Sequence, residues 1–454
     1  MPTARQAALD ALLKMDRNLG YSNIVLDNLL KSGELPESEQ ALCSRLVYGT
    51  VERRLTLDYI LTKCSTVAIK RMHPVVLEIL RLGAYQLMFM EKIPPSAAVN
   101  ESVKLAKVNR QGHAAGFVNG VLRGVQRRQA SLMDMLPEGL DEPEGLEGQA
   151  IRCSCPSVLI RMWRDAYGCE TALRLLEGIN DVPDAYIRVN TLAATASAFE
   201  TLLTQADIPF RTHPELPACI AVKAPSLLKT LAHTRKNWYY HQDTASQYAC
   251  KALSPRPGER IADVCAAPGG KSFTCAQWME NRGELLCCDV YASKCEEMDR
   301  RARELGISII STAVRDAAAP IPGPLKERFD RVICDVPCSG LGVIRRKPEI
   351  RYKPLDTFRE LPELQYTILQ RSAELVRPGG VLQYSTCTLN PAENEQVTER
   401  FLQEHREFTP RMLPLKSCFT AAGCEPSHRI TLFPHLHHTD GFYIAGFCKN
   451  GVNT

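Results

Sequence analysis

Apolar side chains recur at helical spacing over the first part of the chain. Leu9, Leu12 and Leu13 share one helix face, and the same spacing returns between Val76 and Met88. No heptad repeat persists through these residues, which argues against a coiled coil. The breaks in the pattern fall at Gly33 to Pro36, at His73-Pro74 and at Pro94-Pro95. Residues 1–130 are therefore predicted to form an all-α bundle of several short helices.

The pattern changes after this bundle. The run from Leu136 to Gly145 is rich in proline, glycine and acidic residues, which sustain neither helix nor strand, so residues 131–150 are predicted to be a linker. Residues 151–245 then combine one helical stretch with strand-like runs. The helix is expected near 158–166, and the strands near 185–189 and 219–223. This stretch is predicted to be a small α+β module.

Short apolar runs alternate with helical stretches over residues 246–450. The strand-like runs are 260–265, 284–289, 307–312, 330–335 and 380–385. Such alternation predicts a Rossmann-like α/β domain with a doubly wound, largely parallel sheet. Folds of this kind bind ligands at the carboxyl ends of the strands. We therefore look for chemistry at the residues that follow each predicted strand.

Composition narrows the class of protein. Of the 454 residues, 45% are hydrophobic and 23% are charged, which is typical of a folded globular chain and not of a disordered one. No apolar run approaches the roughly 18 residues that a membrane span needs, and no signal peptide begins the chain, so we expect a cytoplasmic protein without a membrane partner. Its 18 cysteines are expected to be reduced thiols. Because Cys-x-x-Cys is absent and the cluster from His435 to His438 lacks zinc-site spacing, no metal is assigned.

Positive charge gathers in two places, although the net charge is only +4. Between Val99 and Arg128, six Lys and Arg residues stand against Glu101 alone. Between Leu341 and Arg359, six stand against two acidic residues. Either stretch fits contacts with nucleic-acid phosphates, and either fits an ordinary solvated helix face.

A glycine turn follows the first predicted strand of the α/β domain. Cys265 leads into Ala266-Ala267-Pro268-Gly269-Gly270-Lys271, and Asp289 ends the next strand, where an acidic side chain commonly binds ribose hydroxyls. A phosphate-binding loop would need glycine at position 265, and a dinucleotide fingerprint would need a third glycine, so ATP and NAD fit poorly. S-adenosylmethionine fits a nucleoside pocket without a diphosphate site. A tight turn without a ligand is the alternative.

Two cysteines follow later strands of the same domain. Cys338 comes directly after Asp335-Val-Pro, and Cys387 ends Tyr384-Ser-Thr-Cys, so both are expected to face the ligand crevice. A thiolate that adds to carbon 6 of a pyrimidine makes carbon 5 nucleophilic enough to accept a methyl group. A second group must then assist loss of the carbon-5 proton and release of the thiolate. Enzymes that methylate exocyclic nitrogen have a different motif here, so carbon methylation is favoured.

These motifs resemble the RNA 5-methylcytosine methyltransferases of the Sun/Nop type, most closely the bacterial RsmB type. The resemblance covers nearly the whole chain. Its motifs are Asp263-Val-Cys-Ala-Ala-Pro-Gly-Gly-Lys271, Asp335-Val-Pro-Cys-Ser-Gly340, Tyr384-Ser-Thr-Cys-Thr388 and Asn390-Pro-Ala-Glu-Asn394. Phe117-Val-Asn-Gly-Val-Leu-Arg123 resembles NusB, an RNA-binding helical domain. Arg188-Val-Asn-Thr191 and Gln242-Asp-Thr-Ala-Ser246 are similar to the RNA-binding insert of this family.

The resemblance implies roles for particular residues. Cys387 would be the nucleophile and Cys338 the group that assists product release, an order that spacing alone leaves open because DNA cytosine methyltransferases use the cysteine of their Pro-Cys pair. The S-adenosylmethionine pocket would consist of Cys265, Ala266, Ala267, Pro268, Gly269, Gly270, Lys271, Asp289, Asp316 and Asp335. Lys294 and Val336 depart from the usual arginine and alanine of the family without removing a catalytic group.

The expected function is 5-methylcytosine formation in small-subunit (16S) ribosomal RNA by a monomeric enzyme that flips the target base out of its stack. The bundle and the small module would hold the RNA. Two alternatives stay open. One is a non-catalytic RNA-binding or antitermination-like factor on a methyltransferase scaffold. The other is the same chemistry on another RNA.

Overall fold

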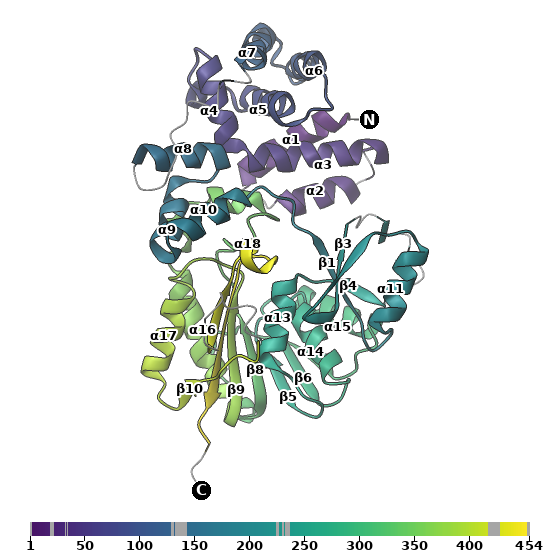
Figure 1. Ribbon diagram of the computed structural model, residues 1–454, viewed down its shortest axis with the longest axis vertical. Coiled ribbons are helices and arrows are strands. Elements are labelled where there is room, and N and C mark those ends of the chain that lie inside the picture. Colours follow the sequence, from purple (N-terminus) through teal and green to yellow (C-terminus); the bar gives the residue numbers. More distant parts are fainter. Residues whose placement is uncertain are drawn as a thin grey trace. The chain divides into compact units, whose positions relative to one another are not determined.

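The computed structural model divides the chain into two compact units. It describes residues 2–451 except 19–21, 32, 34, 129–130, 132–142, 224–226, 229–230, 232–236 and 416–426. Unit 1 consists of residues 1–181 together with 344–353, and unit 2 consists of 182–343 and 354–454. Figure 1 shows helices alone in the first unit and mixed helices and strands in the second. The two units are described separately below.

Unit 1 begins with seven α-helices that surround one apolar core, as the helical pattern predicts. The core takes side chains from every one of these helices, among them Leu9, Leu46 and Leu122. The helices are α1 (Ala4–Asn18), α2 (Ser22–Lys31), α3 (Glu37–Glu52), α4 (Arg54–Cys64), α5 (Pro74–Phe89), α6 (Pro95–Val108) and α7 (Ala115–Arg128), with short 3-10 turns η1 (Ile69–Arg71) and η2 (Gly112–Ala114). Proline begins α5 and α6 at a position where helices tolerate it, because that residue needs no amide hydrogen.

Three further helices complete the continuous part of unit 1: α8 (Pro143–Cys153), α9 (Ser157–Tyr167) and α10 (Cys169–Glu177). Helix α9 agrees with the prediction, but α8 occupies residues 143–150 of the predicted linker, so the linker prediction is wrong there. Leu146 and Ala150 are buried one turn apart and give this short helix an apolar face. Packing thus overrides a composition that disfavours helix. Residues 132–142 of the predicted linker lie outside the described residues.

A ten-residue segment that interrupts the chain of unit 2 completes unit 1. Residues 344–353 include the 3-10 turn η5 (Pro348–Tyr352). The Arg351 guanidinium is fully buried and donates hydrogen bonds to the carbonyls of Glu52, Ser154 and Ile179 and to Asn180 Oδ1. This segment therefore belongs to the helical unit by its packing, although the chain enters it from a strand of unit 2 and leaves it for a helix there.

Unit 2 begins with a small antiparallel sheet of strand order β2-β3-β1-β4. Its strands are β1 (Ala185–Val189), β2 (Phe210–His213), β3 (Leu216–Val222) and β4 (Tyr239–His241), and α11 (Ala196–Gln205) packs on them through Phe199 and Leu203. The strands expected near 185–189 and 219–223 are confirmed. Tyr239 and Tyr240 are buried, which agrees with a structural role for the aromatic run that begins at Trp238.

The larger sheet has eight strands and is parallel at its centre, as predicted. Along it the order is β10-β12-β9-β8-β5-β6-β7, and β11 pairs with β12. The strands are β5 (Arg260–Asp263), β6 (Glu284–Asp289), β7 (Ile310–Val314), β8 (Phe329–Asp335), β9 (Val376–Thr386), β10 (Phe408–Pro410), β11 (Arg429–Leu432) and β12 (Phe442–Lys449). Strands β7, β6, β5, β8 and β9 run parallel, and β10, β11 and β12 are antiparallel additions.

Helices cover both faces of this sheet. Figure 1 shows α16 and α17 on one face and α13, α14 and α15 on the other. Each face has its own apolar cluster, one containing Leu369 and Phe401 and the other Phe273 and Met298. The helices are α13 (Thr244–Leu253), α14 (Gly270–Trp278), α15 (Ala292–Glu304), α16 (Leu361–Leu375), α17 (Glu395–Glu404) and the short α18 (Pro434–His437), with 3-10 turns η4 (Gly323–Leu325) and η6 (Leu355–Phe358).

One predicted strand lies elsewhere. The prediction placed a strand over 307–312, but β7 begins at Ile310. Ile307 is buried against α15, and its amide donates to the carbonyl of Ala302, so this apolar residue ends a helix instead of starting a strand. A buried position alone does not distinguish these two environments.

The described residues contain neither a membrane-spanning helix nor a cluster of metal-binding side chains. None of their helices is both long and apolar enough to cross a membrane. Within the same residues, no three His, Cys, Asp or Glu side chains form a group that could hold a metal ion. Sixteen cysteines fall in the described part of the chain, and none of these sixteen forms a disulfide bond.

Candidate functional site

The glycine turn between β5 and α14 has a backbone that requires glycine. Gly269 has φ of +101°, and a Cβ atom built there would lie 2.4 Å from the Phe273 ring. A larger residue would therefore suffer backbone strain and a steric clash. The Gln242 amide nitrogen is buried without a partner and would lie 3.5 Å from a Cβ at Gly270. At the carboxyl end of β5, the turn therefore permits close approach to its backbone. The buried donor of Gln242 lies beside it.

Lys271 joins this turn to the end of β8. Its Nζ atom lies 2.7 Å from Asp335 Oδ2, and the Ser385 hydroxyl on β9 donates to Asp335 Oδ1 at 2.6 Å. Burial disfavours the charged ammonium, but the Asp335 carboxylate outweighs burial and raises the pKa of Lys271 above its usual value. The amine therefore stays charged at neutral pH. One carboxylate at the end of β8 thus orients two side chains, one from the glycine turn and one from β9.

The two predicted thiols meet at this edge. Cys338 Sγ and Cys387 Sγ lie 3.3 Å apart, and both side chains are half-buried and so accessible from solvent. The hydrogen bond with Cys387, together with burial, raises the pKa of Cys338 well above that of an ordinary thiol. Cys338 therefore keeps its proton at neutral pH and can donate a hydrogen bond to the Cys387 sulfur.

A buried carboxylate anchors the turn that carries Cys338. Glu393 is fully buried and accepts hydrogen bonds from the Ser339 amide at 2.9 Å and the Ser339 hydroxyl at 2.5 Å. Gln365 and Asn390 donate to the same carboxylate at 2.9 and 2.8 Å. A buried carboxylate with four donors is well satisfied, so it holds the turn in one position.

The loop beyond Cys338 returns to the backbone of Cys387. The Gly342 amide donates to the Cys387 carbonyl at 3.0 Å, and the Gly342 carbonyl accepts from Gly441 at 2.9 Å. A Cβ atom at Gly342 would lie 2.0 Å from the Gly441 carbonyl oxygen, so only glycine permits this approach. These backbone contacts hold the loops of the two thiols together.

Two further predicted acids lie at the ends of neighbouring strands. Asp289 ends β6, is nearly buried, and accepts a hydrogen bond from the Tyr291 amide, with Lys294 Nζ at 3.7 Å. Asp316 follows β7, is exposed, and accepts from the Ala318 amide within its own turn. The Arg315 amide donates to the Asp289 carbonyl and so links the two strand ends.

The structure thus brings the predicted residues to one edge of the parallel sheet, where Lys271 contacts Asp335 and Cys338 contacts Cys387. Sequence reasoning did not select Glu393 or Ser385, although both stand inside the motifs that it quoted. A carboxylate in Asn390-Pro-Ala-Glu-Asn394, next to a catalytic motif, was the available signal. An adjacent pair of thiols, a charged lysine and a glycine turn together suit nucleophilic chemistry beside a bound nucleoside.

Comparisons with known proteins agree along the whole chain. Family models match residues 2–127 (NusB family), 155–228 (RsmF/B-like methyltransferase, ferredoxin-like domain) and 250–448 (16S rRNA methyltransferase RsmB/F). The "Probable ribosomal RNA small subunit methyltransferase B" of Bacillus subtilis (strain 168) is 37% identical over 461 residues, which cover 99% of each chain.

Solved structures share the fold. One crystal structure covers 98% of this chain and 99% of its own, with TM-score 0.79 and 24% identity. A methyltransferase homologue from Pyrococcus horikoshii covers 68% of this chain and 99% of its own, with TM-score 0.58 and 29% identity. The first of these likenesses concerns the fold alone.

Proposed function

The chain belongs to the RsmB/F family of 16S rRNA methyltransferases, and on that premise we propose that it methylates carbon 5 of a cytosine in small-subunit ribosomal RNA. S-adenosylmethionine is the methyl donor in this proposal. The observation that carries the proposal is the 3.3 Å approach of the Cys338 and Cys387 sulfurs at the carboxyl edge of the sheet. Two accessible thiols so close together suit an enzyme that first forms and then releases a covalent bond to a pyrimidine. We also propose that the protein is a monomer and that it acts in the cytoplasm.

The residues around the glycine turn fit S-adenosylmethionine. The turn leaves no room for a Cβ at Gly269. Asp335, Asp263 and Asp289 end β8, β5 and β6, which are neighbouring strands of the sheet. Cys265 to Lys271, with Asp289, Asp316 and Asp335, would hold the cofactor, and the Asp289 carboxylate suits the ribose hydroxyls. The cofactor supplies an electrophilic methyl group when it is bound.

Cys387 acts as the nucleophile in this proposal. Its thiolate adds to carbon 6 of the flipped cytosine, and the electron pair of the C5–C6 double bond then forms the new carbon–methyl bond at carbon 5, while the bond from the methyl group to the donor's sulfur breaks with its electrons on that sulfur. The Cys338 S–H group, which keeps its proton, donates a hydrogen bond to the Cys387 sulfur before this addition. That hydrogen bond stabilises the thiolate.

Cys338 assists release. Water takes the carbon-5 proton, the electrons of that C–H bond restore the C5–C6 double bond, and the bond between carbon 6 and Cys387 breaks with its electrons on sulfur. A hydrogen bond from Cys338 stabilises the departing thiolate, so its loss is expected to trap the enzyme on its RNA. The Glu393 carboxylate keeps Cys338 in reach because it fixes the Ser339 turn.

A trapping experiment tests these roles. The Cys338→Ala variant, incubated with S-adenosylmethionine and small-subunit ribosomal RNA, is expected to give a band of protein joined to RNA on a denaturing gel. The band is expected to vanish when Cys387→Ala is added. Cys448→Ala, a half-buried thiol on β12, is the matched control and should turn over as the wild type does.

Other outcomes contradict the proposal. A band that persists in the double variant excludes Cys387 as the nucleophile and refutes the roles assigned to the two cysteines, because both thiols are then absent. Absence of methyl transfer by the wild-type protein, combined with strong RNA binding, favours the non-catalytic alternative. Methyl transfer to another RNA and none to small-subunit ribosomal RNA keeps the chemistry and replaces the substrate.

A further inference from the structure

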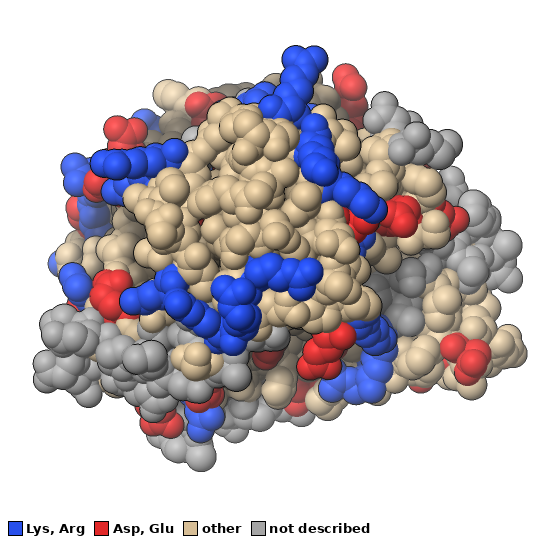
Figure 2. Space-filling view, turned by 90° about the horizontal axis from the view of Figure 1, so that it is seen from above, with Lys and Arg blue, Asp and Glu red and all other residues tan. Residues whose placement is uncertain are grey.

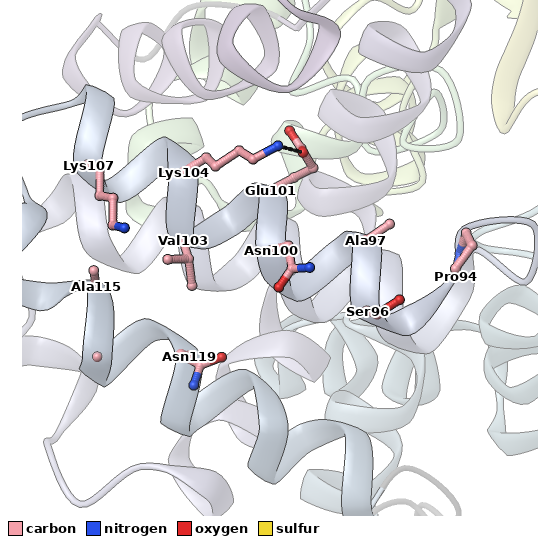
Figure 3. Close-up of a pocket in the computed structure, with 11 residues that line it drawn as sticks. Pro94, Ser96, Ala97, Asn100, Glu101, Val103, Lys104, Lys107, Ala115 and Asn119 are labelled. Atoms are coloured by element: carbon pink, nitrogen blue, oxygen red, sulfur yellow. Dashed lines mark hydrogen bonds and ion pairs between the residues drawn. The ribbon is translucent and has the colours of Figure 1, made fainter.

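Arg188 on β1 is a buried cation without an acidic partner. Figure 2 shows the more ordinary place of Lys and Arg side chains, at the surface. Figure 3 shows Lys104 beside its acidic partner Glu101, at 2.6 Å. Arg188 is only 1% exposed, and it forms no ion pair with any residue that the structure describes. Because burial of an unpaired charge is costly, the groups that accept its hydrogen bonds must be well placed.

The hydrogen bonds of Arg188 go to glutamine side chains. Its Nε atom donates to Gln277 Oε1 at 3.1 Å, and its Nη1 atom donates to Gln247 Oε1 at 3.3 Å. The guanidinium also lies over the Trp278 ring, 5.5 Å from the ring centroid. Because arginine has donors and no acceptor, both glutamines must turn their oxygens toward it and their amide nitrogens away. Arg188 therefore orients both glutamine amides.

One branch of hydrogen bonds continues from Gln277 to Gln242. Gln277 Nε2 donates to the Tyr240 hydroxyl at 3.2 Å. That hydroxyl lies 2.9 Å from Thr274 Oγ1, which donates to Gln242 Oε1 at 2.8 Å. Burial raises the pKa of Tyr240 to about 12, so its proton is present at neutral pH and can be donated to Thr274. The four side chains are buried, which strengthens hydrogen bonds between them.

A second branch reaches the backbone of the same residue. Gln247 Nε2 donates to the Gln242 carbonyl at 3.2 Å, and the Gln242 backbone N–H donates to the Tyr186 carbonyl on β1 at 3.2 Å. Only Nε2 of Gln242 is left without a partner among the described residues. This nitrogen is the Gln242 atom nearest to a Cβ built at Gly270, at 3.5 Å. The relay from Arg188 to Gln242 thus ends with a donor that faces the first residue of α14.

A donor at this place favours an anion. The amino end of a helix carries partial positive charge, and α14 begins at Gly270. The Gln242 amide adds to that potential, whereas the charge of Lys271 is matched by Asp335. The methyl donor of the proposed function, S-adenosylmethionine, has one anionic group, the carboxylate of its amino acid part. The orientation of Gln242 suits that carboxylate.

We propose that Arg188 prepares the glycine turn for the carboxylate of S-adenosylmethionine, through the relay that ends at the Gln242 amide nitrogen. Arg188 and Gln242 are then positioning residues, and they connect the small sheet of unit 2 with the turn. The inference rests on the proposed function. Both residues stand in motifs that resemble those of an RNA-binding insert, and the relay gives them a different task, in cofactor binding.

Binding of two probe ligands to the full-length protein tests the relay. S-adenosylhomocysteine carries the carboxylate, whereas methylthioadenosine has the same nucleoside and sulfur without it. Tyr240→Phe removes one hydroxyl from the middle of the relay, and its ring can keep the contact with Phe273. Loss of this hydrogen bond is expected to weaken S-adenosylhomocysteine binding about fivefold and to leave methylthioadenosine binding within about twofold. Titration calorimetry measures both affinities.

Tyr239→Phe is the matched control. Tyr239 precedes Tyr240 on β4, is equally buried, and donates to the Leu228 carbonyl at 3.2 Å, outside the relay. Its variant also loses one buried hydrogen bond, but both affinities should stay within about twofold of the wild type.

Two further variants act at the ends of the relay. Arg188→Met replaces the buried charge with an apolar chain of similar length, a kind of change that proteins tolerate well, so the protein is expected to stay folded. Gln242→Met removes the amide that faces the turn. Each is expected to weaken S-adenosylhomocysteine binding about tenfold, with methylthioadenosine binding unchanged. Thermal unfolding verifies that each variant is folded.

Methyl transfer gives an independent measure and separates the two proposals. In the relay variants, the S-adenosylmethionine concentration at half-maximal rate should rise by the same factors, while the corresponding RNA concentration stays unchanged. If the wild type binds both ligands and the variants weaken both equally or neither, the relay proposal is overturned and the proposed function stands. If the wild type binds neither ligand, the proposed function is overturned as well.

Discussion

At the scale of single residues, the candidate site depends on buried charges that have partners. Asp335 is shared by Lys271 and Ser385, and Glu393 accepts four hydrogen bonds around the Cys338 turn. Each buried carboxylate thus holds the neighbouring side chains that contact it in one position. Because a buried carboxylate that loses its donors is costly, these positions tolerate little substitution.

The first prediction concerns Glu393. Glu393→Gln replaces one acceptor oxygen with a donor that faces the Ser339, Gln365 and Asn390 donors, so we expect the free energy of unfolding to fall by about 2 kcal/mol. The displaced Cys338 turn should lower the rate of methyl transfer at saturating RNA about tenfold. Steady-state transfer of labelled methyl groups and thermal unfolding measure both effects. Glu363→Gln, which changes a carboxylate with 70% exposure, is the control, and an equal loss in both variants would contradict this anchoring role.

The second prediction concerns Asp263, which is buried behind the glycine turn. Burial raises the pKa of this carboxyl to about 6, against a hydrogen bond from Ser272 that lowers it. The folded protein therefore binds this proton more tightly than the unfolded chain does, and its contribution to stability is full below about pH 4 and declines as the pH rises to about 6.

Asp263→Asn removes this pH dependence. Relative to the wild type, the variant should gain stability between about pH 4 and about pH 7, by up to about 3 kcal/mol for a pKa change of about two. Calorimetric unfolding at both pH values measures the difference. Asp356→Asn, whose side chain is 83% exposed, should show no such gain, and a constant difference between Asp263→Asn and wild type would refute the assignment.

At the scale of elements, the parallel strands deliver chemistry to one edge, and the connection after β8 does more than link two elements. It carries Cys338, approaches the Cys387 backbone at Gly342, and then supplies residues 344–353 to unit 1. Arg351 and Tyr352 anchor that segment, with the Tyr352 hydroxyl donating to the Val51 carbonyl at 2.8 Å. The loop that carries Cys338 is therefore continuous in sequence with a structural part of the helical unit.

The third prediction tests this anchor. Arg351→Met keeps much of the side-chain length but removes four hydrogen bonds to buried acceptors, so unit 1 should lose about 3 kcal/mol of stability. Thermal unfolding of the full-length protein should reveal the change. Arg359→Met lies just beyond the segment, with 80% of its side chain exposed, and should stay within about 0.5 kcal/mol of the wild type. Equal shifts in the two variants would show that burial of Arg351 contributes nothing.

At the scale of the whole molecule, the chain joins a helical unit to a unit that carries two adjacent thiols. The relative from Bacillus subtilis aligns over 99% of each chain, so the likeness extends over both units.

The fourth prediction addresses the substrate in the cell. In cells that lack this protein, one 5-methylcytosine of small-subunit ribosomal RNA should disappear, because no other thiol pair would form the adduct at that base. Sequencing after bisulfite conversion measures this loss. The wild-type chain should restore the modification and Cys387→Ala should not. An unchanged small-subunit map would reject this RNA as the substrate.

Much of this protein follows from local patterns. Helical periodicity identifies the bundle, and alternating strand and helix signals identify the parallel sheet, because each pattern reflects which side of an element is buried. The glycine turn and both thiols were also predicted, since strand ends of such sheets face a common crevice. Linker composition at 143–150 and the apolar run at Ile307 misled the prediction, because tertiary packing determined their conformation.

The sequence by itself therefore determined the classes of domain, the order of elements and the candidate chemistry at the ends of β5, β8 and β9. Only the tertiary structure decided the 3.3 Å distance between sulfurs 49 residues apart, the anchoring of Ser339 by Glu393 and the place of residues 344–353 in unit 1. Hydrophobic periodicity indicates which side of its own helix or strand a residue occupies. Contacts between distant residues depend on strand register and loop paths, which a local pattern does not encode.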